Sequence, residues 1–335
     1  MKKLFTTILI CLLIQTGQSQ TFHPLSSGHK SSFRGLDTYK NNVLWVSGSN
    51  GMVGKSLDAG ITWQWVSPLG YEKFDFRDIE IFSAKEAVIV SAGSPAILLH
   101  TKDGGKSWNE VYRNENPDIF LDGMDFNGKI GYIVGDPING VFQLLKSTDK
   151  GKSWKNVTQS IHLFAEEGEA AFAASGTSLQ VINNWVYIGT GGKYSSLFKR
   201  NEKENKLDVL NVPIWSGLES TGIFSIDFLN ERIGVVIGGN YTSDKDNSNN
   251  ILLTFNAGLS WEKPIQPVWG YRSCVKYISQ DVLIATGTSG TDISKDAGKS
   301  WTNVSSKSFN VIALSKDKKH IYLAGSNGNI EKLIL

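Results

Sequence analysis

Short apolar segments that alternate with polar, glycine-containing turns recur along the whole chain. Residues 44–58, LWVSGSNGMVGKSLD, contain an apolar run, a Gly-rich turn and a second run, and residues 186–201, VYIGTGGKYSSLFKRN, repeat this arrangement. Such runs, bounded by Gly, Asn and Ser, are typical of β-strands. Long amphipathic stretches, which would indicate helices, are few. The pattern therefore predicts an all-β chain built from repeated units.

Five of these units contain nearly the same eight residues, with the pattern S/T-x-D/N-x-G-x-S/T-W, which we call box turns. The Asp or Asn side chain can accept hydrogen bonds from the backbone N–H groups that follow, and the Gly supplies the positive φ that a tight hairpin requires. The Trp then anchors packing between neighbouring sheets. The box turns are SLDAGITW (56–63), TKDGGKSW (101–108), STDKGKSW (147–154), TFNAGLSW (254–261) and SKDAGKSW (294–301). The residues expected to form them are Asp58, Gly60, Trp63, Asp103, Gly105, Trp108, Asp149, Gly151, Trp154, Asn256, Gly258, Trp261, Asp296, Gly298 and Trp301.

The spacing of the box turns predicts a β-propeller. Successive box tryptophans are 45, 46, 107 and 40 residues apart, and periods of roughly 40 to 50 residues are typical of four-stranded propeller blades. The long gap holds two blades, of which the earlier has lost its box turn around residues 199–205. A last unit, residues 309–335, supplies only three strands, and residues 21–27 can add the fourth.

We therefore predict a single domain, residues 20–335, that folds as a seven-bladed β-propeller with four-stranded antiparallel blades. The N-terminal strand pairs with the last blade and closes the ring, which protects the sheet edges. No Pro- or Ser-rich linker interrupts the repeats. The expected blades are 28–66, 72–113, 118–160, 168–213, 220–265, 269–305, and 308–335 together with 21–27.

The first 19 residues have the pattern of a secretory signal peptide. Lys2 and Lys3 precede an apolar run at 4–14, and small residues at Gly17 and Ser19 suit cleavage before Gln20. The run is too short to span a bilayer, and Cys11 lacks the small preceding residue of a lipoprotein signal. We expect export to the periplasm or the cell exterior, and no transmembrane segment.

Charge and cysteine content exclude several classes of function. Without residues 1–19, the chain carries 32 basic and 32 acidic residues, so a nucleic-acid partner has little support. Cys274 is then the sole cysteine, which excludes an intramolecular disulfide and a cysteine zinc cluster, and a buried thiol is expected. The five His show no ligand spacing, and residues 243–250 lack the Gly and Glu of a calcium loop. We expect no metal, no cofactor and a monomer.

Aligning the strands that open the blades predicts a binding site. In a propeller these innermost strands line the central channel, and they begin at the mouth opposite the box turns. Arg suits bidentate capture of carboxylate or phosphate groups, so the arginines of this column predict a cationic arc. In the alternative interpretation they bridge blades by pairing with Asp37, Asp78, Glu80 or Asp122. The second residues of the seven strands are Arg34, Arg77, Asp122, Phe172, Phe224, Arg272 and Asn310.

Three segments lead into the same mouth and extend the candidate site. They are residues 161–170, 212–221 and 266–272, which add Trp215, Trp269 and Tyr271 as candidate binding residues. Loops of this kind enlarge recognition surfaces. The alternative is that their acidic runs are solvated and that their tryptophans cover a blade.

Signatures of catalysis are mostly absent. The chain contains no HExxH, no GxSxG, no P-loop and no dinucleotide fingerprint, so an oxidoreductase has no support. A carboxylate pair at the mouth, Glu169 with Glu219 or with Asp122, would meet the minimal requirement of a glycoside hydrolase. An enzyme, if the chain is one, would therefore be a glycosidase.

The box turns resemble those of BNR or Asp-box propellers, and residues 33–63 resemble the repeat of the photosystem II assembly and stability factor family. The resemblance covers the chain after residue 19, although the fourth blade departs from the pattern. It implies a non-enzymatic, seven-bladed propeller that holds a partner polypeptide through an arginine-rich patch near the channel. Arg34, Arg77 and Arg272 match that patch by their position in the blade. Nothing in the sequence indicates a photosystem, so that partner is not carried over.

The leading hypothesis is an exported binding or assembly propeller whose channel mouth recognises an anionic group on a polypeptide or glycan. A glycoside hydrolase, sialidase-like or glucanase-like, is the alternative. A rigid spacer that binds through its blade edges is a third possibility.

Overall fold

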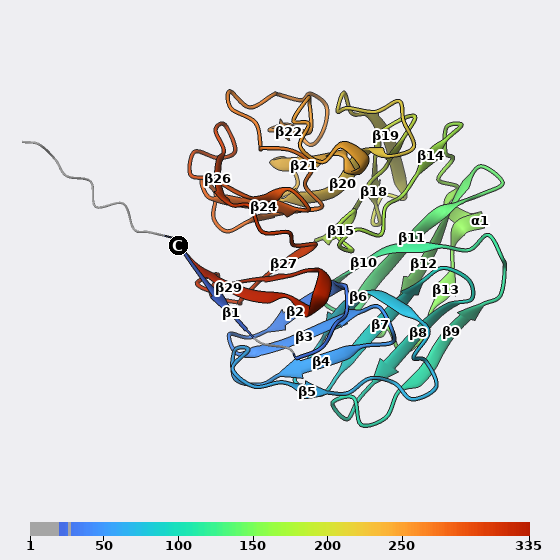
Figure 1. Cartoon of the computed structure of the whole chain (residues 1–335). Helices are drawn as coiled ribbons and strands as arrows, with labels where there is room; N and C mark the ends of the chain where they lie inside the picture. The colour runs from blue at the N-terminus through green and yellow to red at the C-terminus, as the bar shows by residue number, and fades with distance from the viewer. Residues whose placement is uncertain (1–19, 26–27) are drawn as a thin grey trace, which may run out of the picture.

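The computed structural model describes residues 20–25 and 28–335, and these form seven sheets around a central axis (Figure 1). The chain is a seven-bladed β-propeller, which confirms the predicted fold. The predicted signal peptide, residues 1–19, lies outside the described residues. Within the described ranges, no helix is long and apolar enough to cross a membrane.

Blades one to three each contain four antiparallel strands in sequence order. Blade one consists of β2 (Phe33–Tyr39), β3 (Val43–Gly48), β4 (Val53–Ser56) and β5 (Gln64–Trp65). Blade two consists of β6 (Asp75–Ile81), β7 (Ala87–Ala92), β8 (Ala96–Thr101) and β9 (Asn109–Asn114). Blade three consists of β10 (Leu121–Asn127), β11 (Ile130–Ile138), β12 (Val141–Ser147) and β13 (Lys155–Asn156), and the short helix α1 (Thr158–Ile161) follows it.

Blades four and five depart from this regular order. Two short strands that precede blade five in sequence extend its sheet: β17 pairs with the inner strand β20, and β14 pairs with β17, so that the order is β14-β17-β20-β21-β22. The outer strand expected for blade five is reduced to a single bridge between Leu253 and Glu262. Blade four consists of β15 (Leu179–Ile182), β16 (Trp185–Gly189), β18 (Ser196–Asn201) and β19 (Lys206–Asn211). Blade five contains β14 (Glu169–Ala170), β17 (Gly191–Gly192), β20 (Thr221–Phe228), β21 (Gly234–Asn240) and β22 (Ile251–Thr254), with the 3-10 helix η1 (Tyr241–Ser243) after β21.

The N-terminal strand closes the ring, as predicted. Strand β1 (Thr21–Pro24) pairs antiparallel with the last strand, with Thr21 opposite Ile334, and Figure 1 shows β1 in blue beside β29 in red. The ring of Phe22 stacks on Phe309 at a centroid distance of 6.4 Å. Blade six consists of β23 (Cys274–Tyr277), β24 (Leu283–Gly287), β25 (Gly290–Ser294) and β26 (Thr302–Ser305). Blade seven consists of β1, β27 (Val311–Leu314), β28 (Ile321–Ala324) and β29 (Ile330–Ile334), with the 3-10 helix η2 (Ser326–Gly328) before β29.

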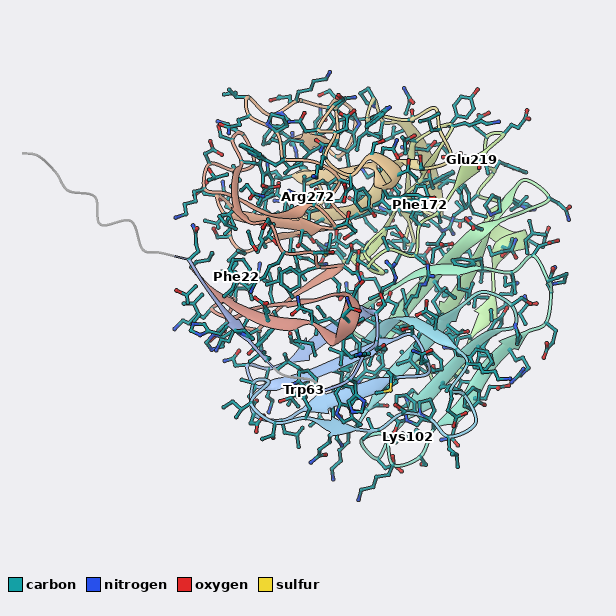
Figure 2. The ribbon with its side chains drawn as sticks, in the orientation of Figure 1. Phe22, Trp63, Lys102, Phe172, Glu219 and Arg272 are labelled. Atoms are coloured by element: carbon teal, nitrogen blue, oxygen red, sulfur yellow. The ribbon has the colours of Figure 1, made fainter. Side chains whose placement is uncertain are left out.

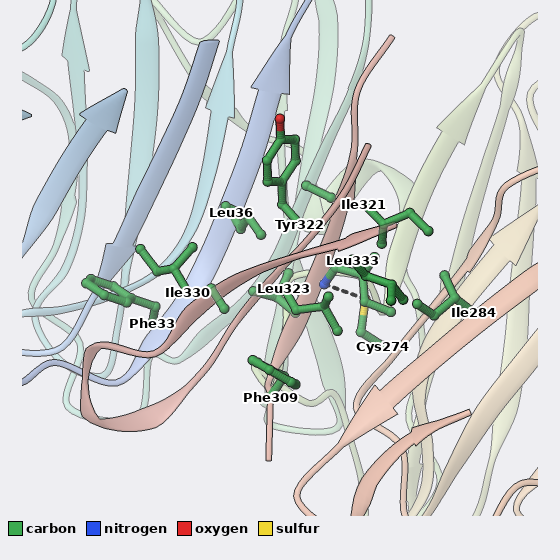
Figure 3. Close-up of a cluster of buried hydrophobic side chains, with 14 of the residues drawn as sticks. Phe33, Leu36, Cys274, Ile284, Phe309, Ile321, Tyr322, Leu323, Ile330 and Leu333 are labelled. Carbon is green, nitrogen blue, oxygen red and sulfur yellow. Dashed lines mark hydrogen bonds between the residues drawn. The ribbon is translucent and has the colours of Figure 1, made fainter. Parts of the chain in front are cut away.

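The hydrophobic core lies between neighbouring blades, because each sheet buries apolar side chains on both faces. Figure 3 shows the cluster where blades six, seven and one meet, with Phe33, Ile284 and Leu323 fully buried. Cys274 is a free, buried thiol in this cluster, and its sulfur accepts a hydrogen bond from the Ile312 amide at 3.4 Å. The expectation of a buried thiol is confirmed.

Each box turn is held by its own side chains. In the first, the Thr62 amide and hydroxyl donate to the two oxygens of Asp58 at 2.8 and 2.5 Å, and the amide of Gly60, whose φ is +90°, donates to the Ser56 hydroxyl at 2.8 Å. The Ala59 amide also donates to Asn42, in the hairpin where β2 ends. The box turns therefore lie on the face where the inner strands end.

The inner strand of blade four is Leu179–Ile182, and the alignment of residues 171–175 with the inner strands of the other blades is wrong. Residues 171–175 belong to no strand. Instead, residues 170–177, which we call the crossing segment, pass across the central channel, as the contacts below show. The departure has a physical cause, because this segment makes its hydrogen bonds to other blades rather than to a strand of blade four.

Candidate binding site at the channel mouth

A cavity of about 410 Å³ opens where the inner strands begin, on the face opposite the box turns. The starts of β2, β6 and β10 contribute Arg34, Arg77 and Asp122, so the repeat places equivalent positions of three blades around one space. We call this space the mouth cavity. Its other polar and aromatic lining residues are Phe120, Asp136, Phe172, Phe224, Tyr241, Tyr271, Ser273, Thr288 and Asn310.

Two arginines give the mouth cavity its positive charge. The Nη1 atom of Arg34 donates to the carbonyl of Ala174 at 3.1 Å, and its guanidinium has no carboxylate partner within ion-pair distance in the described structure. Burial, and then the charge of Arg77, lower the pKa of Arg34. Arg77 pairs with Asp75 at 2.8 Å and remains 30% exposed. Two like charges that share one cavity favour an anionic ligand.

Two carboxyl groups, of Asp122 and Asp136, also line the mouth cavity. Asp122 is 2% exposed, and its Oδ2 atom has no hydrogen-bond partner in the described part of the chain. Burial and the charge of Asp136 raise the pKa of Asp122 well above its usual range, although Arg77 opposes that shift. Burial also raises the pKa of Asp136 to about 6, and its Oδ1 accepts from the Ala171 amide at 3.0 Å. Burial thus favours the uncharged form of Asp122, in which this carboxyl does not compensate the arginine charges.

Aromatic rings form one wall of the mouth cavity. Phe172 stacks on Phe224 at a centroid distance of 3.9 Å, and Tyr271 meets Phe224 edge to face at 4.8 Å. Tyr241 lies 6.0 Å from Phe224 and is 50% exposed. Phe172 is thus at the mouth as expected, although it arrives there from the crossing segment and not from an inner strand.

Arg272 does not join the other two arginines, which corrects the predicted cationic arc. Its side chain is fully buried within blade six, where Nε donates to Asp292 at 2.7 Å and Nη1 donates to the Ser289 hydroxyl at 2.6 Å. The reason is the ion pair with Asp292, since both side chains are fully buried and the pair holds the guanidinium inside its own blade. Asn310 does line the mouth cavity, and its amide donates to the Phe33 carbonyl at 2.8 Å, which joins blades seven and one.

The remaining predicted residues lie outside the mouth cavity. Trp215 is half-buried and Trp269 is 58% exposed, and neither lines the cavity. Glu169 is buried and accepts from the Glu166 amide at 2.9 Å and from the Thr190 hydroxyl, so it holds its own loop together. Glu219 is exposed, farther from the centre of the ring than Phe172 (Figure 2). The structure therefore does not bring Glu169 or Glu219 together with Asp122, as the glycosidase alternative requires.

Sequence reasoning missed several lining residues, among them Phe120, Asp136 and Tyr241. Phe120 precedes β10, Asp136 lies on β11, and Tyr241 lies in η1, so none belongs to the aligned column of inner strands. Within η1, the Asn240 side chain accepts from the Thr242 amide at 2.9 Å, which fixes the turn that carries Tyr241. The Asn-x-Thr spacing was the one local signal that this turn is ordered.

The crossing segment forms the floor of the mouth cavity. Besides its contacts with Arg34 and Asp136, it donates from the Ser175 hydroxyl to the Ser273 carbonyl at 2.7 Å and from the Thr177 hydroxyl to Ser225 at 2.6 Å. These partners lie on blades one, three, five and six. Residues 170–174 line the mouth cavity, and residues 175–177 line a second cavity beyond them.

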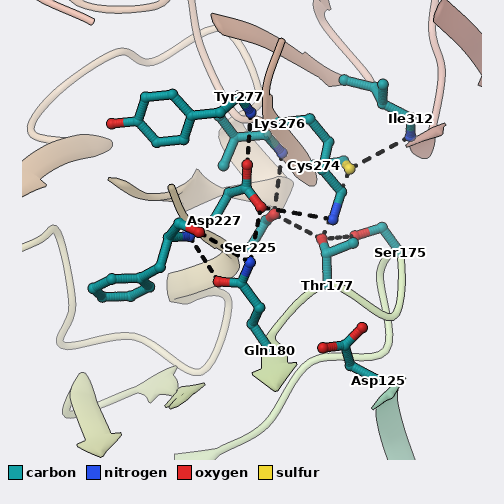
Figure 4. Close-up of polar contacts among 12 residues, drawn as sticks. Asp125, Ser175, Thr177, Gln180, Ser225, Asp227, Cys274, Lys276, Tyr277 and Ile312 are labelled. Carbon is teal, nitrogen blue, oxygen red and sulfur yellow. Dashed lines mark hydrogen bonds and ion pairs between the residues drawn. The ribbon is translucent and has the colours of Figure 1, made fainter. Parts of the chain in front are cut away.

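The second cavity, of about 350 Å³, lies where the inner strands end and is lined by several carboxylates around one lysine. Lys276 lies 3.9 Å from Asp227, and Figure 4 shows both beside Thr177 and Ser225. Burial raises the pKa of Asp37 to about 6 and that of Asp125 to about 7. We call the cluster of Asp37, Asp78, Glu80, Asp125 and Lys276 the acidic well. No group of three side chains in the described ranges is arranged to hold a metal ion.

Comparisons with known proteins agree with this architecture. The sequence profile of the family described as photosynthesis system II assembly factor YCF48 matches residues 17–117 and 78–171. The chain is 24% identical over 296 residues to the photosystem II assembly lipoprotein Ycf48 of Synechococcus sp. (strain CC9902), which covers 85% of this chain and 80% of that protein. It is 26% identical over 185 residues to the chloroplastic photosystem II stability/assembly factor HCF136 of Arabidopsis thaliana, covering 53% of this chain and 41% of the relative.

Solved structures share the fold at low sequence identity. A structure of YCF48 bound to a D1 peptide has a TM-score of 0.68 at 15% identity and covers 94% of this chain and 95% of its own. YCF48 from Cyanidioschyzon merolae has a TM-score of 0.64, also at 15% identity, and covers 93% of this chain and 98% of its own. The chain is a BNR-type β-propeller that resembles the photosystem II assembly factors.

Proposed function

We propose that this chain is a non-enzymatic binding or assembly propeller that holds a polypeptide partner at the mouth cavity through an anionic group of that partner. The observation that carries the proposal is the pair Arg34 and Arg77 in one cavity, where Arg34 has a carbonyl as its partner and no carboxylate. A guanidinium in that state keeps donors available for a carboxylate or phosphate.

Two further observations support a polypeptide partner outside the cell interior. The structurally similar YCF48 was solved with a D1 peptide, so this type of propeller can hold a peptide. The similar Synechococcus protein is named a lipoprotein, and residues 1–19 have the pattern of a signal peptide. We therefore propose that the chain is exported and acts as a monomer in the periplasm or outside the cell.

The paired arginines of the mouth cavity favour an anion over a cation. Asp75 compensates Arg77 in part, and burial raises the pKa of Asp122, which favours the uncharged form of that carboxyl. The aromatic wall excludes water from one side, which strengthens charge interactions within the cavity. An acidic side chain of the partner would accept from the guanidinium N–H groups while its neighbours contact the rings.

The test is a capture experiment from envelope extract with residues 20–335, with bound proteins identified by mass spectrometry. The native chain is compared with the double variant Arg34→Ala, Arg77→Ala, and with the control variant Arg113→Ala. Arg113 pairs with Glu110 and Glu115 on the outer strand of blade two, away from the mouth cavity. Circular dichroism checks the fold of each protein.

We expect one or more proteins that the native chain and Arg113→Ala retain and that the double variant loses at least about tenfold. Equal capture by all three proteins would place the binding site elsewhere, for example on the blade edges. Turnover of sialosides or β-glucans by the pure native protein would instead establish a glycosidase.

A further inference from the structure

Beside the mouth cavity, three large apolar side chains are exposed on three separate loops. Leu218 is 53% exposed, Tyr241 is 50% exposed and Trp269 is 58% exposed. They come from the loop before β20, from η1 and from the loop before β23. We call these three side chains the apolar rim. Exposed apolar side chains on neighbouring loops, unlike scattered ones, indicate an interaction surface.

Hydrogen bonds join the three loops of the apolar rim to one another. The Tyr241 amide donates to the Ser220 carbonyl at 3.3 Å, which links the first loop to the second. The Tyr271 amide donates to the Asp244 carbonyl at 2.8 Å, which links the second loop to the third. The Thr288 hydroxyl also donates to the Asp244 side chain at 2.8 Å. The rim is therefore held in place before any partner arrives, which lowers the entropic cost of binding.

The third loop is fixed by a close backbone approach. Gly270 has a φ of +135°, and a Cβ at this position would lie 2.2 Å from the Asp244 carbonyl oxygen. Only glycine permits this contact, so Trp269 is presented by a segment packed directly against the loop of Tyr241.

The apolar rim is continuous with the mouth cavity through Tyr241. This ring lines the cavity, lies 6.4 Å from Tyr271, and is also exposed beyond the cavity edge. A partner whose acidic group reaches Arg34 and Arg77 would therefore pass over Tyr241 as it leaves the cavity. The charged cavity would therefore bind the acidic group of a partner, and the apolar rim would contact the residues next to that group.

We propose that the apolar rim binds aliphatic or aromatic residues that flank the acidic group of the partner polypeptide. The partner is then an extended segment in which an acidic residue is followed or preceded, within a few positions, by large apolar residues. This inference rests on the proposed function, because the acidic group fixes where the segment enters. Apolar anchors next to a charged contact are a common way for interfaces to gain affinity.

The test uses a library of displayed random dodecapeptides that is selected on four immobilised proteins. They are the native chain, the rim variant Leu218→Ser, Trp269→Ser, which leaves the cavity-lining Tyr241 in place, the double variant Arg34→Ala, Arg77→Ala, and the control Ile61→Ser. Ile61 suits the control because it is 79% exposed in the first box turn, on the opposite face. Sequencing of the selected peptides gives residue enrichment, and fluorescence anisotropy gives the affinity of the most enriched peptide.

We expect the native chain and Ile61→Ser to select peptides in which acidic and large apolar residues lie close together. The rim variant should still select acidic residues, lose the apolar enrichment, and bind the best native peptide about tenfold more weakly. The double variant should lose the acidic enrichment. Native selection of acids without apolar neighbours, or unchanged apolar enrichment on the rim variant, overturns the inference and leaves the proposed function intact. Absence of acidic enrichment on the native chain itself overturns the proposed function, and with it the inference that rests on it.

Discussion

At the scale of single residues, the box turns allow the contribution of hydrogen bonds to turn stability to be compared with the contribution of the Asp charge, because one of the five turns has Asn in place of Asp. In four turns an Asp accepts from the residue four positions later, as Asp149 does from the Ser153 amide at 3.0 Å and from its hydroxyl at 2.6 Å. In the remaining turn Asn256 accepts from the Ser260 amide at 2.9 Å and donates to the Ser260 hydroxyl at 2.8 Å. An amide therefore fills the same position by reversing one hydrogen bond.

This comparison predicts a large difference between two substitutions of Asp149. We expect Asp149→Ala to lower the free energy of unfolding by about 1 to 2 kcal/mol, because the Ser153 amide and hydroxyl lose their acceptor. Asp149→Asn should cost less than about half of that, since it can adopt the hydrogen bonds of Asn256. Urea unfolding at pH 7 measures both values. Equal losses would mean that the charge, and not the hydrogen-bond geometry, stabilises the turn.

At the scale of elements, the crossing segment is the unit that makes two cavities from one channel. It has little regular structure, and its position depends on contacts with several blades. Gly176 has a φ of +73°, and a Cβ there would lie 2.1 Å from an oxygen of Asp78. Asp78 cannot easily move, because its two oxygens accept from the Ile79 and Met124 amides, each at 2.8 Å.

We predict that Gly176→Ala destabilises the chain or displaces the crossing segment, at a cost of about 2 to 4 kcal/mol from overpacking and left-handed strain together. Gly140→Ala is the matched control, because Gly140 has a φ of +75° and a Cβ added there would meet no atom within 4 Å. The control should therefore lose only about 1 kcal/mol from strain. Urea unfolding of both variants measures the difference, and similar losses would show that Asp78 yields to the added methyl group.

At the scale of the whole molecule, the acidic well and the box turns make the free energy of unfolding change with pH in opposite directions. In the well, the folded-state pKa values of Asp37 and Asp125 are raised by burial to about 6 and 7, so their contribution to stability is full below about pH 4 and is lost as pH rises through 6 to 7. In the box turns, hydrogen bonds from Thr62 and Ser107 lower the pKa values of Asp58 and Asp103 to about 2, so their contribution is present above about pH 4 and is lost as pH falls toward 2.

We therefore expect the urea midpoint to be highest near about pH 4 to 5 and to fall toward pH 8. Lys276→Met should enlarge that fall, because Lys276 is the cation beside the ionised carboxylates of the well. The expected loss is about 2 to 4 kcal/mol at pH 8 and clearly less at pH 5. Lys206→Met is the control, since Lys206 is 61% exposed in a surface pair with Asp208 and should change little at either pH. A loss that is equal at both pH values would contradict the role of Lys276.

The sequence predicted the fold because its signals are local and periodic. The spacing of the box tryptophans predicted the length of a blade, and the incomplete last unit predicted that the N-terminal strand completes it. The structure confirms both predictions. The binding site was harder to predict than the fold. Aligning the opening strands assumes that the second residue of each one occupies the same position at the channel mouth. That holds for Arg34 and Arg77, and it fails for Arg272, which is buried in its own blade against Asp292. Tyr241 carries no periodic signal, because a loop packed through non-local hydrogen bonds brings it to the mouth.

The pairing of β1 with β29 also determines the order in which this protein can be completed. The two strands are more than 300 residues apart in sequence, so the last blade cannot form until both ends of the propeller are available together. Contacts of such long range are slow to form. Until residues 330–334 have been synthesised and are free to fold, the chain therefore has six blades at most, and β1 has no strand to pair with. The complete wall of the mouth cavity, which includes Asn310 and its hydrogen bond to blade one, is among the last parts of the propeller to form.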